Sequence, residues 1–302
     1  MNPPRDLSEP LPDQLVTRVL RTGLNPAYLV RVARMTLAED LAGGVDVTSV
    51  ATIPDEARAT ADLVARAPGV VAGLPVAEVV VHLVTGGDHE VEYHVADGDP
   101  VEPGQRLLSV TASTRSLLTA ERSALNLLCR LSGIATTTRR WVDAVAGTGA
   151  EIRDTRKTTP GLRALEKYAV RRGGGVNHRM GLWDVALVKD NHVVAAGSVE
   201  AAFAAVRETF PGLAVEVEVD RLDQIPAVLE AGAEEILLDN MDPSELRKAV
   251  ELVAGRARLE ASGGLTLAGA RSVAETGVDY LAVGALTHSA PILDIACDLR
   301  AS

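Results

Sequence analysis

The stretch AVEVEVDRLDQIPAVLEAGAEEILLDN, residues 214–240, predicts a strand, a helix and a second strand. Its first seven residues alternate valine with acidic residues after the opening alanine, which is the period-two pattern of a β-strand. Residues 222–231 have apolar side chains at helical spacing, and residues 235–240 are a short apolar run with a polar end. Two strands joined by a helix are typical of a parallel sheet with right-handed crossovers, so this stretch predicts an α/β fold.

The same unit recurs through the second half of the chain. Strands are predicted at 152–157, 185–190, 214–220, 235–240, 258–264 and 280–286, with helices at 199–209, 222–231, 243–254 and 266–276. So many strand–helix units favour a barrel over an open sheet. The carboxyl ends of barrel strands converge on one mouth, and here each predicted strand ends in polar residues or glycine. We therefore expect the functional site at that mouth.

The first half of the chain has a different pattern. A helical pattern begins near Pro26 and ends at the glycines of EDLAGGVDVTS (39–49). Residues 59–112 are strand-like and contain turn signals such as Asp97-Gly98. These features predict a compact α+β domain.

Leucines at helical spacing between Thr114 and Val145 predict a long helix at the junction of two domains. Residues 1–25 are rich in proline and charge, and we expect them to form a loosely held lead-in. The expected N-terminal domain is therefore 26–130 and the expected C-terminal barrel domain is 131–302.

The composition disfavours several classes of protein. A net charge of −11 and a pI near 5.1 argue against nucleic acid or an anionic membrane as the main partner. Cys129 and Cys297 are far apart and lack metal-ligand spacing, so we expect no disulfide framework, no zinc site and a reduced, cytoplasmic setting. No apolar leader and no apolar run of about 18 residues is present, so no membrane span is expected.

Residues 154–192 form a basic segment in this acidic chain. Between Glu151 and His192 there are nine Lys/Arg and five Asp/Glu residues. Arginine and lysine side chains bind carboxylates and phosphates, so the segment predicts a site for a small, highly charged anion. The candidate ligands at or near predicted strand ends are Arg156, Lys157, Arg179 and Lys189, with His178 able to donate to an anion or to fill a structural role.

Acidic residues face the same predicted mouth. Alternation along 214–220 puts Glu216, Glu218 and Asp220 on one face, where they would repel one another unless cations or a metal ion lie among them. Lys157, Lys189 and a divalent ion are the available compensators, and the alternative is an exposed edge strand with solvated acids. Asp239 extends the set and suits a hydroxyl-binding or Mg²⁺-binding role through its oxygens.

Glycine-rich segments follow the last two predicted strands. They are Ser262-Gly263-Gly264 and Val283-Gly284-Ala285. Backbone N–H groups without a neighbouring Cβ can approach phosphate oxygens closely, and this position is typical of a barrel phosphate site. The alternative is an ordinary turn.

Several segments together resemble the quinolinate phosphoribosyltransferase family. They are EDLAGGVDVTS, ERSALNLLCRLSGIAT (121–136), the run from 154 to 192, EVEVD, LLDN, ASGGL and AVGALTHSAP. The resemblance extends over roughly residues 26–300. One departure is local, because the family usually has glycine where Ala42 stands and a Gly-Asp pair where Val45-Asp46 stands.

The resemblance implies an α/β fold with an N-terminal α/β sandwich domain and a C-terminal incomplete, open barrel of the TIM type. It implies a homodimer or an assembly of dimers. It also implies a pentosyltransferase that uses Mg²⁺, quinolinate and phosphoribosyl pyrophosphate to make nicotinate mononucleotide, pyrophosphate and CO₂ in NAD biosynthesis.

The resemblance also assigns roles to residues. Those implied to line the quinolinate and pyrophosphate pocket are Arg122, contributed by the neighbouring subunit, with Thr155, Arg156, Lys157, His178, Arg179 and Lys189. Glu218 and Asp239 are implied to hold the metal and the ribose hydroxyls. The implied ligands of the 5′-phosphate are Ser262, Gly263, Gly264, Val283, Gly284 and Ala285. Catalysis is expected from Lys157, Lys189, Glu218 and Asp239.

Other functions remain open from the sequence. A relative linked to molybdenum transport shares the fold, and nicotinate phosphoribosyltransferases have a related one. Lys189 at a strand end would also suit a Schiff-base aldolase. The non-enzyme alternative is a phosphate-binding barrel that senses a metabolite.

Overall fold

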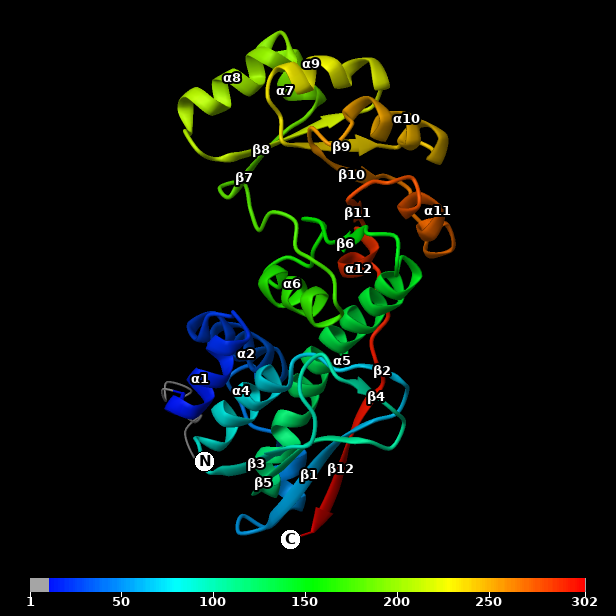
Figure 1. Cartoon of the computed structure of the whole chain (residues 1–302). Coiled ribbons are helices and arrows are strands. Elements are labelled where there is room, and N and C mark those ends of the chain that lie inside the picture. The colour runs from blue at the N-terminus through cyan, green and yellow to red at the C-terminus, as the bar shows by residue number, and fades with distance from the viewer. Residues whose placement is uncertain (1–10, 302) are drawn as a thin grey trace. The chain divides into compact units, whose positions relative to one another are not determined.

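The computed structural model describes residues 11–301, and their contacts divide the chain into two units (Figure 1). Unit 1 consists of the chain through Thr137, residues 159–174 and the segment from Ala290 onward. Unit 2 consists of residues 138–158 and 175–289. The fold is α/β, as predicted, with an antiparallel sheet in unit 1 and a parallel sheet in unit 2.

Unit 1 combines a four-stranded sheet with helices. Its strand order is β12 (Ile295–Ala301), β1 (Arg58–Ala65), β5 (Arg106–Ser113) and β3 (His89–Tyr93), and a separate ladder joins β2 (Gly69–Val70) to β4 (Pro100–Val101). The helices are α1 (Asp13–Arg21), α2 (Pro26–Leu41), α3 (Val47–Thr52), α4 (Leu74–Thr85), α6 (Arg163–Arg172) and the first part of α5 (Thr114–Ala144). Helices α1, α2 and α4 pack against one another (Figure 1). Helix α5 confirms the long helix predicted from the leucine spacing.

Helix α1 corrects the expectation of a loose lead-in. Leu15 and Val19 lie on one face of this helix and are buried, and Arg18 forms an ion pair with Glu78 of α4. The prolines and charges of this segment concealed a short amphipathic helix, because only two apolar positions make its buried contacts. The expectation for residues 1–10 lies outside the described residues.

Helix α4 was also missed, because residues 59–112 were predicted to be strand-like throughout. Every residue of α4 is buried, and apolar side chains so dominate its sequence LPVAEVVVHLVT that the polar residues Glu78, His82 and Thr85 form only a narrow stripe. Its valines favour a strand by propensity, and the burial of the whole segment overrides that preference. The carboxylate of Asp97 accepts hydrogen bonds from the N–H groups of Gly73 and Leu74 at the start of the helix, at 2.8 and 3.0 Å.

The turn after α2 explains the local departure noted in the sequence. Ala42 ends this helix in the left-handed conformation with φ of 46°, where glycine has no steric penalty. Asp46 then caps α3, because its carboxylate accepts a hydrogen bond from the N–H of Ser49 at 3.0 Å. The segment therefore keeps a regular helix start at the cost of one strained residue.

Unit 2 is a parallel sheet with helical crossovers. The strand order is β6 (Glu151–Arg153), β11 (Tyr280–Ala282), β10 (Arg258–Ser262), β9 (Glu235–Asp239), β8 (Ala214–Val219) and β7 (Val185–Val188). The main crossover helices are α8 (Val199–Thr209), α9 (Ile225–Glu230), α10 (Pro243–Val253) and α11 (Ala270–Ala274). Along the chain, each of them connects two strands of the sheet (Figure 1). Short helices α7 (Asp190–Ala196) and α12 (Ala285–His288) follow β7 and β11.

The first strand of unit 2 pairs with its last, whereas β7 lies at the opposite edge. No ladder joins β6 to β7 within the described residues, so the barrel is open between them, as predicted. Val217, Ile236 and Leu238 on the central strands are fully buried, which fits a sheet covered by helices.

The strands of unit 2 are shorter than predicted. Strand β6 stops at Arg153 and β11 stops at Ala282, and the residues after them leave the ladder. Helices α6 and α7 were not predicted, because charged residues and glycines in the basic segment obscure their helical spacing. Arg156, Lys157 and Lys189 therefore lie beyond their strands, where side chains can approach a ligand. Glu218, Asp239 and Ser262 lie at or near the last positions of β8, β9 and β10.

Two segments of the expected barrel domain at 131–302 make their contacts in unit 1. Residues 159–174, which contain α6, belong to unit 1. So does the end of the chain, where β12 pairs with β1 in antiparallel register. Chain order cannot reveal this arrangement, because it depends on pairing between segments that are distant in sequence.

Candidate active site

A cavity of about 250 Å³ lies where the strands of unit 2 reach their carboxyl ends. Its lining residues are Thr155, Arg156, Lys157, His178, Arg179, Leu187, Lys189, Glu218, Leu237, Asp239, Glu260, Ser262 and Ala282. The structure thus brings together most of the predicted site residues. Those not among the lining residues are Arg122, Gly263, Gly264, Val283, Gly284 and Ala285.

Two of the four predicted cations in the cavity are already engaged. Lys189 forms an ion pair with Glu218, and Nη1 of Arg179 donates to the carbonyl oxygen of Val185 at 3.0 Å. The side-chain nitrogens of Arg156 and Lys157 have no hydrogen-bond or ion-pair partner among residues 11–301, and Nε of Arg156 is buried. Arg156 and Lys157 therefore offer positive charge to a ligand.

The positively charged guanidinium groups of Arg156 and Arg179 repel each other. Burial, and after it the positive charge of Arg156, lower the pKa of Arg179. An anion that contacts both groups would remove this repulsion. A carboxylate or phosphate ligand between the two guanidinium groups would therefore be favourable.

The predicted row of carboxylates along β8 is only partly correct. Glu216 is buried and Glu218 lines the cavity, but Asp220 is exposed. Strand β8 ends at Val219, and the N–H of Asp220 donates to Oε1 of Gln224 at 2.9 Å as the chain turns away. Lys189 compensates Glu218 as expected, whereas Lys157 makes no ion pair with these acids in the part of the chain that is described.

The third carboxylate of this cavity is Glu260 on β10, which the sequence analysis did not select. Its side chain is fully buried, and its Oε2 accepts a hydrogen bond from Nη1 of Arg153 at 2.6 Å. Arg153 also lies over the ring of Tyr280, with 3.8 Å between Cζ and the ring centroid. The sequence contained an indication of this role, because Glu260 is a charged residue between two apolar ones, Leu259 and Ala261, in a short strand of the core.

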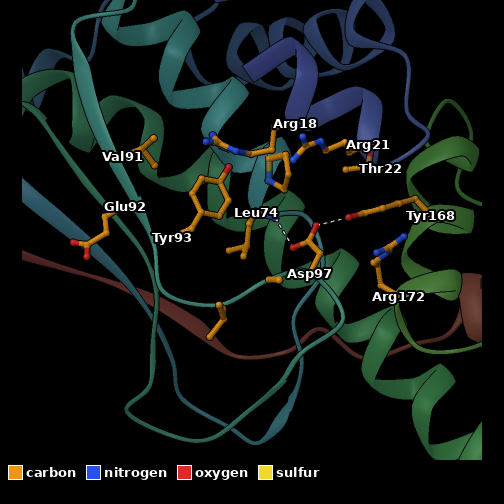
Figure 2. A pocket seen from close by; sticks show the side chains of 13 residues that line it. Arg18, Arg21, Thr22, Leu74, Val91, Glu92, Tyr93, Asp97, Tyr168 and Arg172 are labelled. Atoms are coloured by element: carbon orange, nitrogen blue, oxygen red, sulfur yellow. Dashed lines mark hydrogen bonds between the residues drawn. The ribbon is translucent and has the colours of Figure 1, made fainter. Parts of the chain in front are cut away.

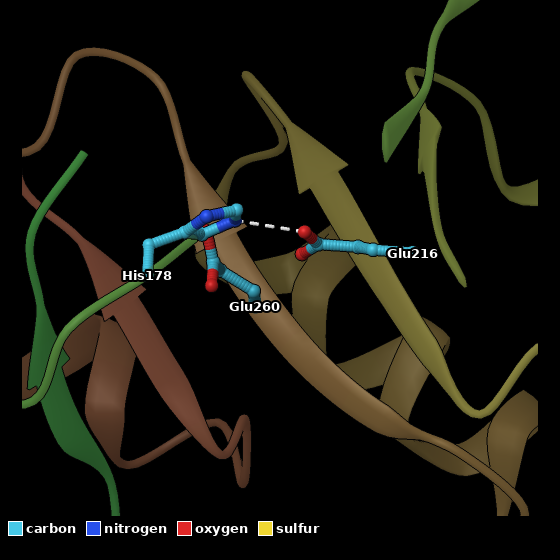
Figure 3. A group of neighbouring side chains, drawn as sticks. All are labelled: His178, Glu216 and Glu260. Carbon is cyan, nitrogen blue, oxygen red and sulfur yellow. Dashed lines mark hydrogen bonds and ion pairs between the residues drawn. The ribbon is translucent and has the colours of Figure 1, made fainter. Parts of the chain in front are cut away.

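His178 lies between two buried carboxylates (Figure 3). Its Nε2 is 2.8 Å from Oε2 of Glu216 and 3.6 Å from Oε1 of Glu260. Its Nδ1 accepts a hydrogen bond from the N–H of Arg179 at 2.7 Å. Both ring nitrogens thus contact the protein, and the imidazole also lines the cavity, so the structural role is present beside any role in binding.

Two glycines near the cavity lie where a larger side chain would meet neighbouring atoms. Gly263 has φ of 94°, and a Cβ there would come within 2.1 Å of Oδ1 of Asn240. A Cβ at Gly284 would come 3.0 Å from Cδ of Lys157, which follows β6. Glycine at these positions therefore allows close packing around the strand ends, while phosphate binding there stays a prediction.

Two family models together match most of the chain. The model described as quinolinate phosphoribosyl transferase, N-terminal domain, matches residues 46–132, and the corresponding C-terminal domain model matches residues 134–298. The chain belongs to the quinolinate phosphoribosyltransferase family. Its resemblance to that family is thereby confirmed.

Individual relatives agree with this assignment. The chain is 57% identical over 270 residues to the nicotinate-nucleotide pyrophosphorylase [carboxylating] of Mycobacterium leprae, covering 88% of this chain and 95% of the relative. It is 39% identical over 280 residues to the probable nicotinate-nucleotide pyrophosphorylase [carboxylating] of Bacillus subtilis, covering 92% and 96%. The crystal structure of NadC from Streptococcus pyogenes matches with a TM-score of 0.88 at 39% identity, covering 92% and 99%. These relatives are phosphoribosyltransferases, so the protein is an enzyme of this class.

Family membership disfavours the other functions left open by the sequence. Lys189 is ion-paired with Glu218, whereas the lysine of a Schiff-base aldolase must be available as an unprotonated amine. The cationic cavity differs from what a simple phosphate sensor requires, because it also contains several carboxylates. No described helix is both long enough and apolar enough to cross a membrane.

Arg122 lies on α5 in unit 1, where its side chain is exposed. Its implied role across a subunit interface stays a prediction. The expectation of unpaired cysteines agrees with the structure, since Cys129 and Cys297 are both free.

Oxygen donors suited to Mg²⁺ are present in the cavity. Asp239 is half-buried, and its Oδ2 accepts a hydrogen bond from Nδ2 of the neighbouring Asn240 at 2.8 Å. Glu218 supplies a second carboxylate, which is shared with Lys189. Carboxylate oxygens with access to solvent are the ligands that Mg²⁺ prefers, so the donor set fits this ion.

A larger cavity of about 620 Å³ lies in unit 1 (Figure 2). Some of its polar groups are paired, whereas Nε of Arg172 is buried without a hydrogen-bond partner among the described residues. Asp97 accepts a hydrogen bond from the hydroxyl of Tyr168 at 2.5 Å, and Arg18 pairs with Glu78 and lies 4.3 Å from the ring centroid of Tyr93. It brings together fewer reactive groups than the cavity of unit 2, which is the better candidate for the active site.

Proposed function

We propose that the chain transfers the phosphoribosyl group of phosphoribosyl pyrophosphate to the ring nitrogen of quinolinate. Loss of the 2-carboxyl group then gives nicotinate mononucleotide, pyrophosphate and CO₂ for NAD biosynthesis. The observation that carries the proposal is the pair of unpartnered cations, Arg156 and Lys157, in a cavity that also contains Arg179, Lys189 and carboxylates.

The charge of the cavity matches the charges of the two substrates. Quinolinate has two carboxylates, and its co-substrate has a monophosphate and a pyrophosphate. Arginine binds such groups through paired N–H donors, whereas lysine acts as a mobile point charge. We assign Thr155, Arg156, His178, Arg179 and Lys189 to the quinolinate and pyrophosphate pocket, with Lys157 beside them.

The carboxylates assist cleavage of the bond between ribose C1 and pyrophosphate. Departure of pyrophosphate leaves positive charge on ribose C1, and carboxylates placed nearby stabilise that charge. We assign this role and contacts to the ribose hydroxyls to Glu218 and Asp239. The same two residues would hold Mg²⁺, which when bound neutralises charge on the pyrophosphate.

After transfer, the pyridinium ring withdraws electrons from C2. The 2-carboxylate can therefore leave without a covalent catalyst, and contacts from Lys157 or Lys189 stabilise the charge that remains on the ring. The 5′-phosphate is assigned to Ser262, Gly263 and Gly264 and to the segment from Val283 to Ala285. Gly263 has a positive φ, which glycine adopts without strain.

Turnover tests this proposal directly. Quinolinate labelled in its 2-carboxyl group, phosphoribosyl pyrophosphate and Mg²⁺ should yield labelled CO₂ and pyrophosphate in equal amounts. Nicotinate in place of quinolinate should yield no nucleotide, and product from nicotinate would instead favour a nicotinate phosphoribosyltransferase. Lys157→Ala should lose most activity while Lys248→Ala, which changes an exposed lysine on α10, should not. Full turnover by Lys157→Ala would contradict the electrostatic role.

The active assembly is proposed to be a homodimer in the cytoplasm, with Arg122 contributed to the neighbouring subunit's site. Mixing an Arg122→Ala chain with a Lys157→Ala chain should then restore part of the activity, because one site per dimer would have both residues. If each variant is inactive and the mixture stays inactive, Arg122 acts within its own subunit or not at all.

A further inference from the structure

We infer that Glu260 is the acid that delivers a proton to ring carbon C2 after the carboxyl group leaves. The inference rests on the proposed function and adds a catalytic residue to it. The donor would be the carboxylic acid form of Glu260, held in the cavity by Arg153 and by the pair formed by His178 and Glu216.

The reaction requires such a donor. When the bond between C2 and the carboxyl carbon breaks, CO₂ leaves and the electron pair stays on C2. A proton must then reach C2, so the O–H bond of the acid breaks as the C2–H bond forms. The acid becomes a carboxylate and takes a new proton from water before the next turnover.

Glu260 has the right location for this step. Among the acids that line the cavity, Glu218 is ion-paired with Lys189, and Asp239 is half-exposed. Glu260 lines the same cavity as the four cations, yet its side chain is fully buried. A buried acid beside the ring can transfer a proton without competition from water.

The groups around Glu260 favour the protonated form of its carboxyl group. Glu216 on β8 belongs to the same cluster, and Arg153 on β6 contacts both Glu235 on β9 and Glu260. Oε1 of Glu216 and Oε1 of Glu260 are buried and have no hydrogen-bond partner within residues 11–301. Two ionised oxygens buried in this way are unfavourable, and a proton on Oε1 of Glu260 converts one acceptor into a donor.

The histidine does not carry that proton. Because Nδ1 of His178 accepts from the N–H of Arg179, the ring must bear its hydrogen on Nε2, which donates to Glu216. Burial, and after it the charge of Glu216, raise the pKa of Glu260 to about 7, which agrees with a proton on this carboxyl near neutral pH. Tyr280 on β11 faces Arg153 and completes the set of groups around the cluster.

A bound cation is the competing explanation. One ligand atom from each of His178, Glu216 and Glu260 lies within 4.8 Å of the others, which is compatible with a metal site. A metal would need the lone pair of Nε2, but the hydrogen bond to Nδ1 places the ring hydrogen there. The observed hydrogen bonds therefore favour a proton over a metal ion.

Glu260→Gln tests the inference, because glutamine matches the shape of the neutral acid and cannot release a proton. The matched control is Glu235→Gln, which removes another carboxylate from Arg153 without changing a residue that lines the cavity. We expect kcat of Glu260→Gln to fall about 100- to 1,000-fold, as for loss of a general acid, with KM for both substrates within about threefold of wild type. Glu235→Gln should keep kcat within about threefold.

A second measurement follows the reverse of the same proton transfer. Wild-type enzyme should exchange the C2 hydrogen of bound nicotinate mononucleotide for deuterium in D₂O, and Glu260→Gln should bind the nucleotide without this exchange. Loss of kcat in both variants alike would show that the effect comes through Arg153, and that outcome would overturn the inference. Retention of kcat or of exchange in Glu260→Gln would do the same.

The wild-type pH profile tests the inference without any variant. An acid must be protonated to act, so steady-state formation of nicotinate mononucleotide should fall as pH rises through the pKa of Glu260, which is about 7. A rate that is constant between about pH 6 and 9 would refute the role of Glu260. If wild type releases neither pyrophosphate nor CO₂, the proposed function itself fails. If wild type releases both and Glu260→Gln forms nicotinate mononucleotide at the wild-type rate, only this inference fails.

Discussion

Arg156→Met should weaken ligand binding without reducing the stability of the fold, because the Arg156 side chain is available to a ligand and contributes little to the stability of the protein. Its side-chain nitrogens have no partner among the described residues, and its charge opposes that of Arg179. Methionine keeps most of the apolar stem of arginine and removes the charge. The variant should therefore bind quinolinate weakly and fold normally.

The expected size of the effect follows from the contacts that are lost. A hydrogen bond to a charged partner contributes about 1.5–3 kcal/mol, which corresponds to roughly a 10- to 150-fold rise in Kd for quinolinate. The free energy of unfolding without ligand should stay within about 0.5 kcal/mol of wild type or rise slightly, because a repulsion with Arg179 is removed.

Calorimetric titration with quinolinate and thermal unfolding without ligand measure the two effects separately. The matched control is Arg247→Met, which changes an exposed arginine on α10 outside the cavity and should alter neither quantity. Unchanged affinity in Arg156→Met, or a loss of stability greater than about 1 kcal/mol, would refute the interpretation of Arg156 as an unpaired, ligand-binding cation.

Two further predictions concern unit 1. Ala42→Gly should raise the free energy of unfolding by about 0.5–1 kcal/mol in chemical denaturation, because Ala42 is held at positive φ; a decrease would mean that this strain is absent. Asp62 accepts hydrogen bonds from Nε of Arg300 at 2.7 Å and from the hydroxyl of Ser109 at 2.6 Å, and the contact with Arg300 is the main reason that the pKa of Asp62 is lowered. Its stabilisation is therefore present above the unfolded pKa of about 4 and lost as pH falls through the lower folded value. Asp62→Asn should cost about 1 kcal/mol at pH 7, and the difference from wild type in urea denaturation should shrink toward pH 2; a difference that is the same at both pH values would contradict the linkage.

Much of unit 2 could be predicted from the sequence, because its strands and helices have simple periods. The alternation along β8 and the apolar run of β9 each predicted the correct element, and the order of elements predicted a barrel, whose open form was implied by the family resemblance. The cavity cations were found because basic residues outnumber acidic ones in the segment 154–192 of an otherwise acidic chain.

The errors have physical causes. Helix α4 is buried on all sides and rich in valine, so its narrow polar stripe was overlooked, and α1 depends on two buried residues in a polar segment. Asp220 was placed in the cavity because alternation was extended one residue beyond the strand. Glu260 was missed because its significance lies in contacts with Arg153 and His178, which come from other segments of the chain.

The pairing of β12 with β1 has a consequence for producing fragments of this enzyme. A fragment limited to residues 46–132, the range matched by the N-terminal family model, would contain β1, β3 and β5 but not β12. One side of β1 would then lose its whole row of backbone partners, and such an exposed edge promotes self-association. Expression of the first half alone should therefore yield insoluble material unless residues 295–301 are supplied, for instance through a short linker after β5.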